Sequence, residues 1–155
     1  MLERQRLLSV AVASRKIAFV FFIDGHLKDW HLSRAGGMSA PKGRSFLRTA
    51  IAQCKPDLVL IENPYGPTRK YGRPHEILLA MAQDLADSTT PHRLVMRAQA
   101  YANKYEEAAA LAKQFPEIAP WLPKPRRIWD NEPTEMIYFE ALALTRDEGL
   151  LKRLA

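Results

Sequence analysis

The chain has 155 residues, enough for one domain of ordinary size with a substantial hydrophobic core. Hydrophobic residues make up 47% and charged residues 26%, as in soluble globular proteins, and no apolar run approaches the length that crosses a bilayer. The net charge of +6 is compatible with a polyanionic partner but does not establish one. We therefore expect a single domain over residues 1–155 with no membrane-spanning segment.

Two further features bear on cellular location and redox chemistry. The stretch MLERQRLLSVAVASRK mixes charges with a short apolar run that serines interrupt, which is a poor signal peptide, so we expect a cytoplasmic protein. The single cysteine, Cys54, excludes an internal disulfide and a cysteine-based zinc site. Its place on an apolar helical face predicts a position in the core.

Three strands are predicted before the first helix. Residues 7–13 and 17–23 are rich in residues that favour strands, and Asp24-Gly25 is a hairpin signal before residues 26–32. Apolar residues then recur at helical spacing over residues 42–54. Because a helix between two strands of one sheet normally makes a right-handed crossover, the next strand should run parallel to one of the first three.

That next strand ends in a carboxylate. KPDLVLIEN at residues 55–63 is an apolar run that predicts a strand buried on both faces, and Glu62 closes it. Charged side chains are rarely buried unless they are paired or bound to a metal. Glu62 therefore either points into solvent just past the strand or lies in the crevice where open α/β sheets bind ligands. The spacing alone does not separate these two interpretations.

The loop after Glu62, NPYGPTRKYGRPH at residues 63–75, is rich in basic and tyrosine residues. Basic side chains neutralise phosphates and aromatic faces stack on unpaired bases, so the composition favours a strand of nucleic acid that crosses this edge of the sheet. A solvated loop with charges for solubility is the alternative. The candidate nucleic-acid-binding residues are Arg69, Lys70, Arg73, Tyr65 and Tyr71, and Lys104, Lys124, Arg126 and Arg127 would extend the same patch.

The rest of the chain is mainly helical. Residues 76–86 and about 105–115 show helical spacing, residues 94–96 predict a short strand, and several prolines interrupt residues 116–125. MIYFEALAL at residues 136–144 is apolar except for Glu140, which is typical of a buried helix.

The orientation of Glu140 is open to two interpretations. It could point outward, or it could share the inner face of its helix with Met136, Ile137 and Leu144, which lie three or four residues away. We favour the inward orientation.

This order of elements, β-β-β-α-β-α-β-α-α, resembles the RNase H-like superfamily, and the motifs are most similar to the RuvC family of Holliday-junction resolvases. PDLVLIEN at residues 56–63 is similar to the fourth-strand motif of that family and carries Glu62 onto a catalytic acid. FEALAL at residues 139–144 is similar to an Asp-Ala-Leu-Ala stretch and carries Glu140 onto another. AYANK at residues 100–104 is similar to a Gly-x-Ala-x-Lys segment. The resemblance implies an α/β fold with a mixed five-stranded sheet and helices on both faces.

The chain departs from the family pattern at two acids. The first-strand aspartate falls on Ala11, and a second acid of the last helix falls on Ile137. The resemblance implies phosphodiester hydrolysis with two metal ions, and magnesium needs carboxylate ligands. Mg or Mn is thus a possible cofactor held by Glu62 and Glu140, but a two-ion site is doubtful. Possible substitute acids are Glu135 and Glu132, with Asp130 and Asp24, although helix-start and turn roles explain most of these.

Three functions are open at this stage. We favour a RuvC-like nucleic-acid-binding protein with an incomplete two-metal carboxylate site that engages branched or structured DNA. The alternatives are an active Mg-dependent endonuclease and a non-catalytic protein-interaction domain. The resemblance also implies a possible homodimer, because a four-way junction is two-fold symmetric.

Overall fold

The computed structural model describes residues 5–68, 70–98, 101, 103–124 and 133–150. Five strands and four α-helices follow one another in the expected order. The strands are β1 (Arg6–Ala13), β2 (Lys16–Ile23), β3 (His26–Ser33), β4 (Leu58–Glu62) and β5 (His92–Val95). The α-helices are α1 (Ala40–Cys54), α2 (Arg73–Ala86), α3 (Lys104–Gln114) and α4 (Met136–Asp147), and two short 3-10 helices are η1 (Ala35–Gly37) and η2 (Pro116–Trp121).

The strands form one mixed sheet in the order β3-β2-β1-β4-β5. The first three strands are a meander of antiparallel neighbours, whereas β4 runs parallel to β1 and β5 runs parallel to β4. The pairing of β2 with the edge strand β3 carries a register shift between Phe21 and Phe22. The parallel β4 that the crossover argument predicted is therefore confirmed.

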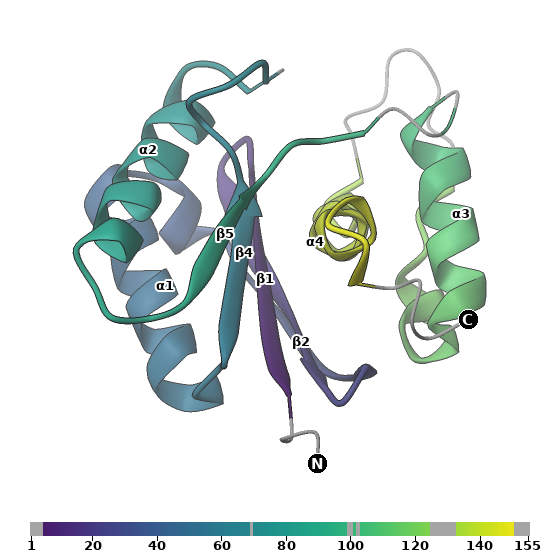
Figure 1. Ribbon diagram of the computed structural model, residues 1–155. Coiled ribbons are helices and arrows are strands. Elements are labelled where there is room, and N and C mark those ends of the chain that lie inside the picture. Colours follow the sequence, from purple (N-terminus) through teal and green to yellow (C-terminus); the bar gives the residue numbers. More distant parts are fainter. Residues whose placement is uncertain (1–4, 69, 99–100, 102, 125–132, 151–155) are drawn as a thin grey trace.

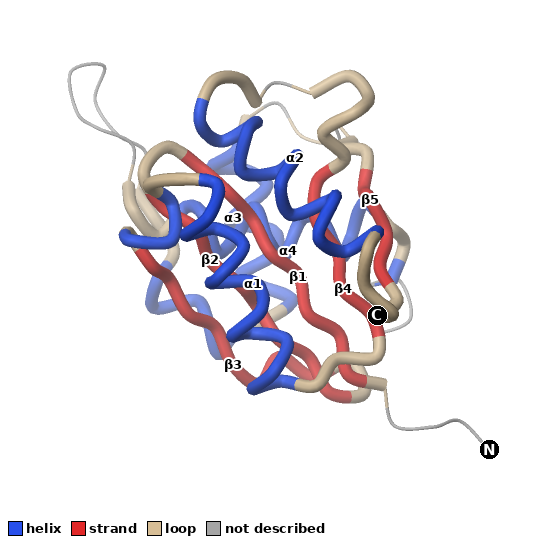
Figure 2. The backbone as a smooth tube through the Cα atoms, turned by 90° about the vertical axis from the view of Figure 1, so that its left-hand side faces the viewer, coloured by secondary structure: helices blue, strands red, loops and turns tan. Residues whose placement is uncertain are grey.

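Helices cover both faces of this sheet (Figure 1). Helices α1 and α2 pack on one face, α4 packs on the other, and α3 lies outside α4. Figure 2, turned by 90°, shows α1 and α2 in front of the strands that they cover. In the part of the chain that the structure describes, no helix is long and apolar enough to span a bilayer.

Alternation along the strands assigns each side chain to a face. Val59 and Ile61 belong to the apolar core beneath α1 and α2, whereas Leu60 belongs to the core beneath α4. Because side chains of a strand alternate between faces, Glu62 lies on the same face as Leu60. The last residue of β4 therefore points toward α4.

A buried polar contact and two aromatic contacts position α4 and the segment outside it. The Ser9 hydroxyl of β1 donates a hydrogen bond of 2.7 Å to the backbone carbonyl of Ala141 in α4. The rings of Trp30 and Trp121 meet edge to face with centroids 5.2 Å apart, and this contact joins η2 to β3, the last strand of the meander. Phe22 and Phe115 make a similar contact at 5.4 Å.

Two elements differ from the sequence expectation. Helix α2 begins at Arg73, three residues before the predicted start, because Pro74 suits the first turn of a helix, where its missing N–H is not needed. The prolines after α3 were predicted to interrupt regular structure, but one of them begins a short helix. Pro116 opens η2, whose Ile118 is buried in the core beneath α4.

Candidate functional site

Glu62 and Ala11 are neighbours at the edge of the sheet where β4 ends. In the parallel register, Val10 pairs with Ile61, and the following residues on the two strands are Ala11 and Glu62. Both side chains line the same small cavity, and Glu62 is only 9% exposed. The position that corresponds to the missing first-strand aspartate thus lies beside Glu62 and carries a methyl group.

Helix α4 brings the second acid to the same cavity. Glu140 and Leu144 line it from α4, so Glu140 faces inward toward Glu62, and we call these two carboxylates the acid pair. Ile137, one turn earlier, is fully buried in the core. The position onto which the resemblance carries another acid is therefore part of the core.

Thr68 and Lys70, in the loop after β4, each contact one member of the acid pair. The Thr68 hydroxyl donates a short hydrogen bond to Oε2 of Glu62. The Lys70 ammonium is 2.7 Å from Oε1 of Glu140, and the Lys70 backbone N–H donates to Oγ1 of Thr68 over 3.1 Å. Each carboxylate thus has a partner from the same loop.

A second charged cluster, which we call the arginine network, consists of Arg97, Arg146, Glu107 and Asp147. Arg97 is 2.8 Å from Glu107 and 2.6 Å from Asp147, and Arg146 is 2.5 Å and 2.8 Å from the same two acids. Burial alone would lower the pKa of Arg97, but Glu107 and Asp147 outweigh it and raise the pKa above its ordinary value. Arg97 therefore stays charged, and it also lines the cavity of the acid pair.

The residues present do not fit a two-metal site. Magnesium keeps several waters and is held by carboxylates, whereas the cavity between Glu62 and Glu140 has a volume of about 10 Å³, the space of one water molecule at most. Among the residues that the structure describes, no three histidine, cysteine or acidic side chains are grouped to hold a metal ion. Lys70 already provides a positive charge at Glu140.

The predicted substitute acids do not join the acid pair where they are described. Glu135 is exposed at the N-terminal cap of α4 and is not among the residues that line the cavity. Asp24 lies in the hairpin turn at φ 51° and accepts a hydrogen bond of 2.7 Å from the Gln5 backbone N–H. Glu132 and Asp130 lie outside the described residues.

Several predicted nucleic-acid-binding residues are exposed near this edge. Tyr65 is exposed in the loop after β4, and Tyr71 in the same loop is 84% exposed. Arg73 is exposed at the first residue of α2, where a positive charge opposes the helix dipole and so does not serve helix stability. Lys104 and Lys124 are exposed at the start of α3 and after η2. The predicted residues Arg69, Arg126 and Arg127 lie outside the described part of the chain.

Sequence reasoning did not identify Arg97 or Thr68. Arg97 comes two residues after the end of β5, which is parallel to β4. Because parallel strands that neighbour each other end at the same edge, this position could have been recognised as part of the site. Thr68 had no such signal, because its contact with Glu62 depends on how the loop folds back.

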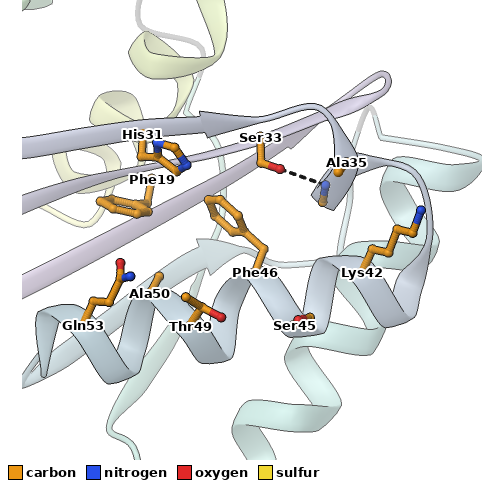
Figure 3. A pocket seen from close by; sticks show the side chains of 11 residues that line it. Phe19, His31, Ser33, Ala35, Lys42, Ser45, Phe46, Thr49, Ala50 and Gln53 are labelled. Carbon is orange, nitrogen blue, oxygen red and sulfur yellow. Dashed lines mark hydrogen bonds between the residues drawn. The ribbon is translucent and has the colours of Figure 1, made fainter.

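A larger hollow of about 390 Å³ lies between α1 and strands β2 and β3 (Figure 3). Phe19, His31 and Phe46 approach one another there, and Lys42 lies at one end. Phe19 belongs to the core beneath α1 and α2, so this hollow is on the opposite face of the sheet from Glu140. No acidic residue lines it, so it is separate from the acid pair.

Neither a protein-family model nor a curated protein matches the sequence. Solved structures do match. RuvC of Thermus thermophilus superimposes with a TM-score of 0.61 at 11% sequence identity. The structure of T. thermophilus RuvC in complex with a Holliday junction substrate superimposes with a TM-score of 0.62 at 12% identity. Each match covers 97% of this chain and 96% of the matched chain. A fowlpox virus resolvase with its substrate Holliday junction DNA gives 0.56 at 15%, over 95% of this chain and 99% of that one. The chain therefore has a RuvC-like, RNase H-like fold, as the sequence predicted.

Proposed function

We propose that this RuvC-like protein binds branched or structured DNA at the edge where β4 and β5 end, without a complete two-metal site for cleavage. One observation carries the proposal: the chain has the whole fold of resolvases solved with Holliday junctions, yet Ala11 stands beside Glu62 where a third carboxylate would be needed. DNA binding and DNA cleavage then require different residues at this end of the strands.

Binding is supported by the side chains around the acid pair. Tyr65 and Tyr71 present aromatic faces to solvent, and stacking of one base on such a ring contributes about 1–3 kcal/mol. Arg73 places a positive charge next to Tyr71, and each phosphate neutralised gives a salt slope of roughly −0.9. Both kinds of contact tolerate any base sequence, so this surface suits recognition of DNA shape and of unpaired nucleotides.

An active endonuclease that uses Mg or Mn is the second candidate in our proposal, and the site supports it less well. Two ions need several shared oxygen ligands, and the acid pair offers two carboxylates. One of these carboxylates is bound by Thr68 and the other by Lys70. A non-catalytic protein-interaction domain is the third candidate.

The test is incubation of the purified protein with a labelled four-way junction and a matched linear duplex, with and without Mg or Mn. We expect the protein to bind the junction more tightly than the duplex and to leave both DNAs intact. Metal-dependent nicking that Glu62→Gln abolishes would instead establish the endonuclease. Neither binding nor nicking would favour the interaction domain.

A second arm of the same experiment maps the DNA-binding surface. Arg73→Ala should reduce the slope of log affinity against log salt by about 1, and Tyr71→Ala should weaken binding by about 1–3 kcal/mol with the slope unchanged. Lys113→Ala, at an exposed position in the last turn of α3, is the matched control for the loss of a charge. Equal slopes for Arg73→Ala and the wild type would remove the start of α2 from the interface.

A single domain, a homodimer and a cytoplasmic location belong to the same proposal. A second copy would match the two-fold symmetry of a four-way junction, and a helical surface would supply the contact. Sedimentation of the protein with and without junction DNA measures the number of copies bound.

A further inference from the structure

Lys70 has an unusual setting for a lysine in a basic loop. Its ammonium is directed at Glu140 rather than at solvent, and its side chain is only 19% exposed. The loop around it is fixed at several points: the Tyr65 backbone N–H donates to Oδ1 of Asn63, and the His75 ring contacts the carbonyl oxygen of Pro64 at 2.9 Å. The position of the ammonium is therefore set by the fold of the loop.

The exposure of the Lys70–Glu140 ion pair can be compared with that of a surface ion pair in the same protein. Arg48 and Asp84 join α1 to α2, but the Arg48 side chain is 66% exposed, and such a pair contributes little because water and salt screen it. Lys70 and Glu140 are 19% and 28% exposed, and Glu62 beside them is almost buried. Charges at this depth are screened less, so two adjacent carboxylates need a nearby positive charge.

We propose that the Lys70 ammonium is the built-in counter-ion of the acid pair and occupies the place that a divalent cation would otherwise take. The small volume left between Glu62 and Glu140 agrees with this assignment, because Lys70 lines this cavity beside both carboxylates and Thr68 holds Glu62 by a hydrogen bond. Arg97 borders the same cavity, but both Glu107 and Asp147 hold its guanidinium. Lys70 is thus the cation that compensates Glu140 directly.

A lysine counter-ion also has consequences for DNA binding. This part of the inference rests on the proposed function. The charge of Glu140 is compensated without a metal, so the DNA-binding surface forms equally well in the presence of a chelator. The same ion pair holds the loop that carries Tyr65 and Tyr71. Loss of the lysine charge opens the acid pair to a divalent ion.

The test measures Mn²⁺ binding without DNA, by the loss of the free-ion signal in electron paramagnetic resonance. Lys70→Met removes the charge and keeps an unbranched side chain, and it should bind Mn²⁺ at least about tenfold more tightly than the wild type, because a unit charge within contact distance is removed. Lys70→Arg keeps the charge and should resemble the wild type. Lys42→Met, at an exposed position in α1, is the matched control for net charge.

Adding Glu140→Gln to Lys70→Met should abolish the gained Mn²⁺ binding. Equal Mn²⁺ affinity in the wild type and in Lys70→Met would overturn the proposal, as would a gain that survives Glu140→Gln. Lys70→Gln provides a second neutral replacement, and circular dichroism checks the fold of every variant. Because these titrations contain no DNA, their failure is distinct from a failure of junction binding, which would overturn the proposed function alone.

Discussion

The acid pair and the arginine network both take residues from the same helix, α4, and they handle charge in different ways. In the arginine network, two arginines and two acids compensate one another, and Asp147 is only 1% exposed. Its members come from α3, α4 and the residues just after β5. The acid pair instead takes its cation, Lys70, from the loop after β4 rather than from β4 or α4.

This difference distinguishes a cluster suited to stability from the candidate functional cluster. Charges balanced among helices leave nothing for a ligand to complete, and their removal acts on stability. Carboxylates whose cation comes from a loop can exchange that partner when the loop moves. Arg97 connects the two regions, because it belongs to the network and lines the cavity of the acid pair.

The largest effect should come from breaking the arginine network. Asp147→Asn would leave Arg97 and Arg146 short of a buried partner, and we expect the free energy of unfolding to fall by about 3–5 kcal/mol. Urea denaturation followed by circular dichroism measures this loss. Asp87→Asn, at the exposed end of α2, is the matched control. A loss below about 1 kcal/mol would show that the network contributes no more to stability than a surface ion pair does.

A smaller effect is expected at the neutral contact between β1 and α4. Ser9→Ala removes the buried hydrogen bond from β1 to the Ala141 carbonyl, and a typical net loss is about 1 kcal/mol. The same denaturation experiment applies, with Ser45→Ala at an exposed position in α1 as the control. A loss as large as that of Asp147→Asn would mean that this hydroxyl, rather than the network, fixes α4.

At the acid pair we expect almost no loss of stability. Glu140→Gln leaves an amide oxygen that can still accept a hydrogen bond from Lys70, and it relieves repulsion with Glu62, so the change should stay within about 1 kcal/mol. Thermal unfolding of Glu140→Gln beside Asp147→Asn makes the comparison directly. Equal destabilisation by the two substitutions would remove the distinction between the two clusters.

The smallest effect should appear at the exposed pair between α1 and α2. The hydrogen bond from Arg48 holds the pKa of Asp84 below its ordinary value of 3.8. A carboxyl with a lowered pKa in the folded state stabilises the protein above its unfolded pKa, and that contribution is lost as the pH falls through the folded value. The difference in urea midpoint between wild type and Asp84→Asn should therefore be small at neutral pH and vanish in acid. A difference that grows on acidification would contradict this assignment.

The sequence was most informative where structure depends on local pattern. The apolar run before Glu62 predicted β4, and helical spacing predicted α1, because these patterns reflect which residues face the core. The contact of Lys70 with Glu140 joins residues 70 positions apart, and no periodicity reports it. Arg73 was assigned to the loop rather than to α2, because a glycine and a proline on either side of it suggested irregular structure.

The edge strand β3 has a consequence for self-association. An exposed strand edge is a template for pairing with another chain, and charged residues and irregular register protect against it. Lys28 and Asp29 are exposed on β3, and the register shift lies opposite them on β2. The other edge, β5, spans only His92–Val95. Both edges therefore discourage aggregation through sheet extension, and a second copy of this chain would have to associate through side chains rather than through a shared sheet.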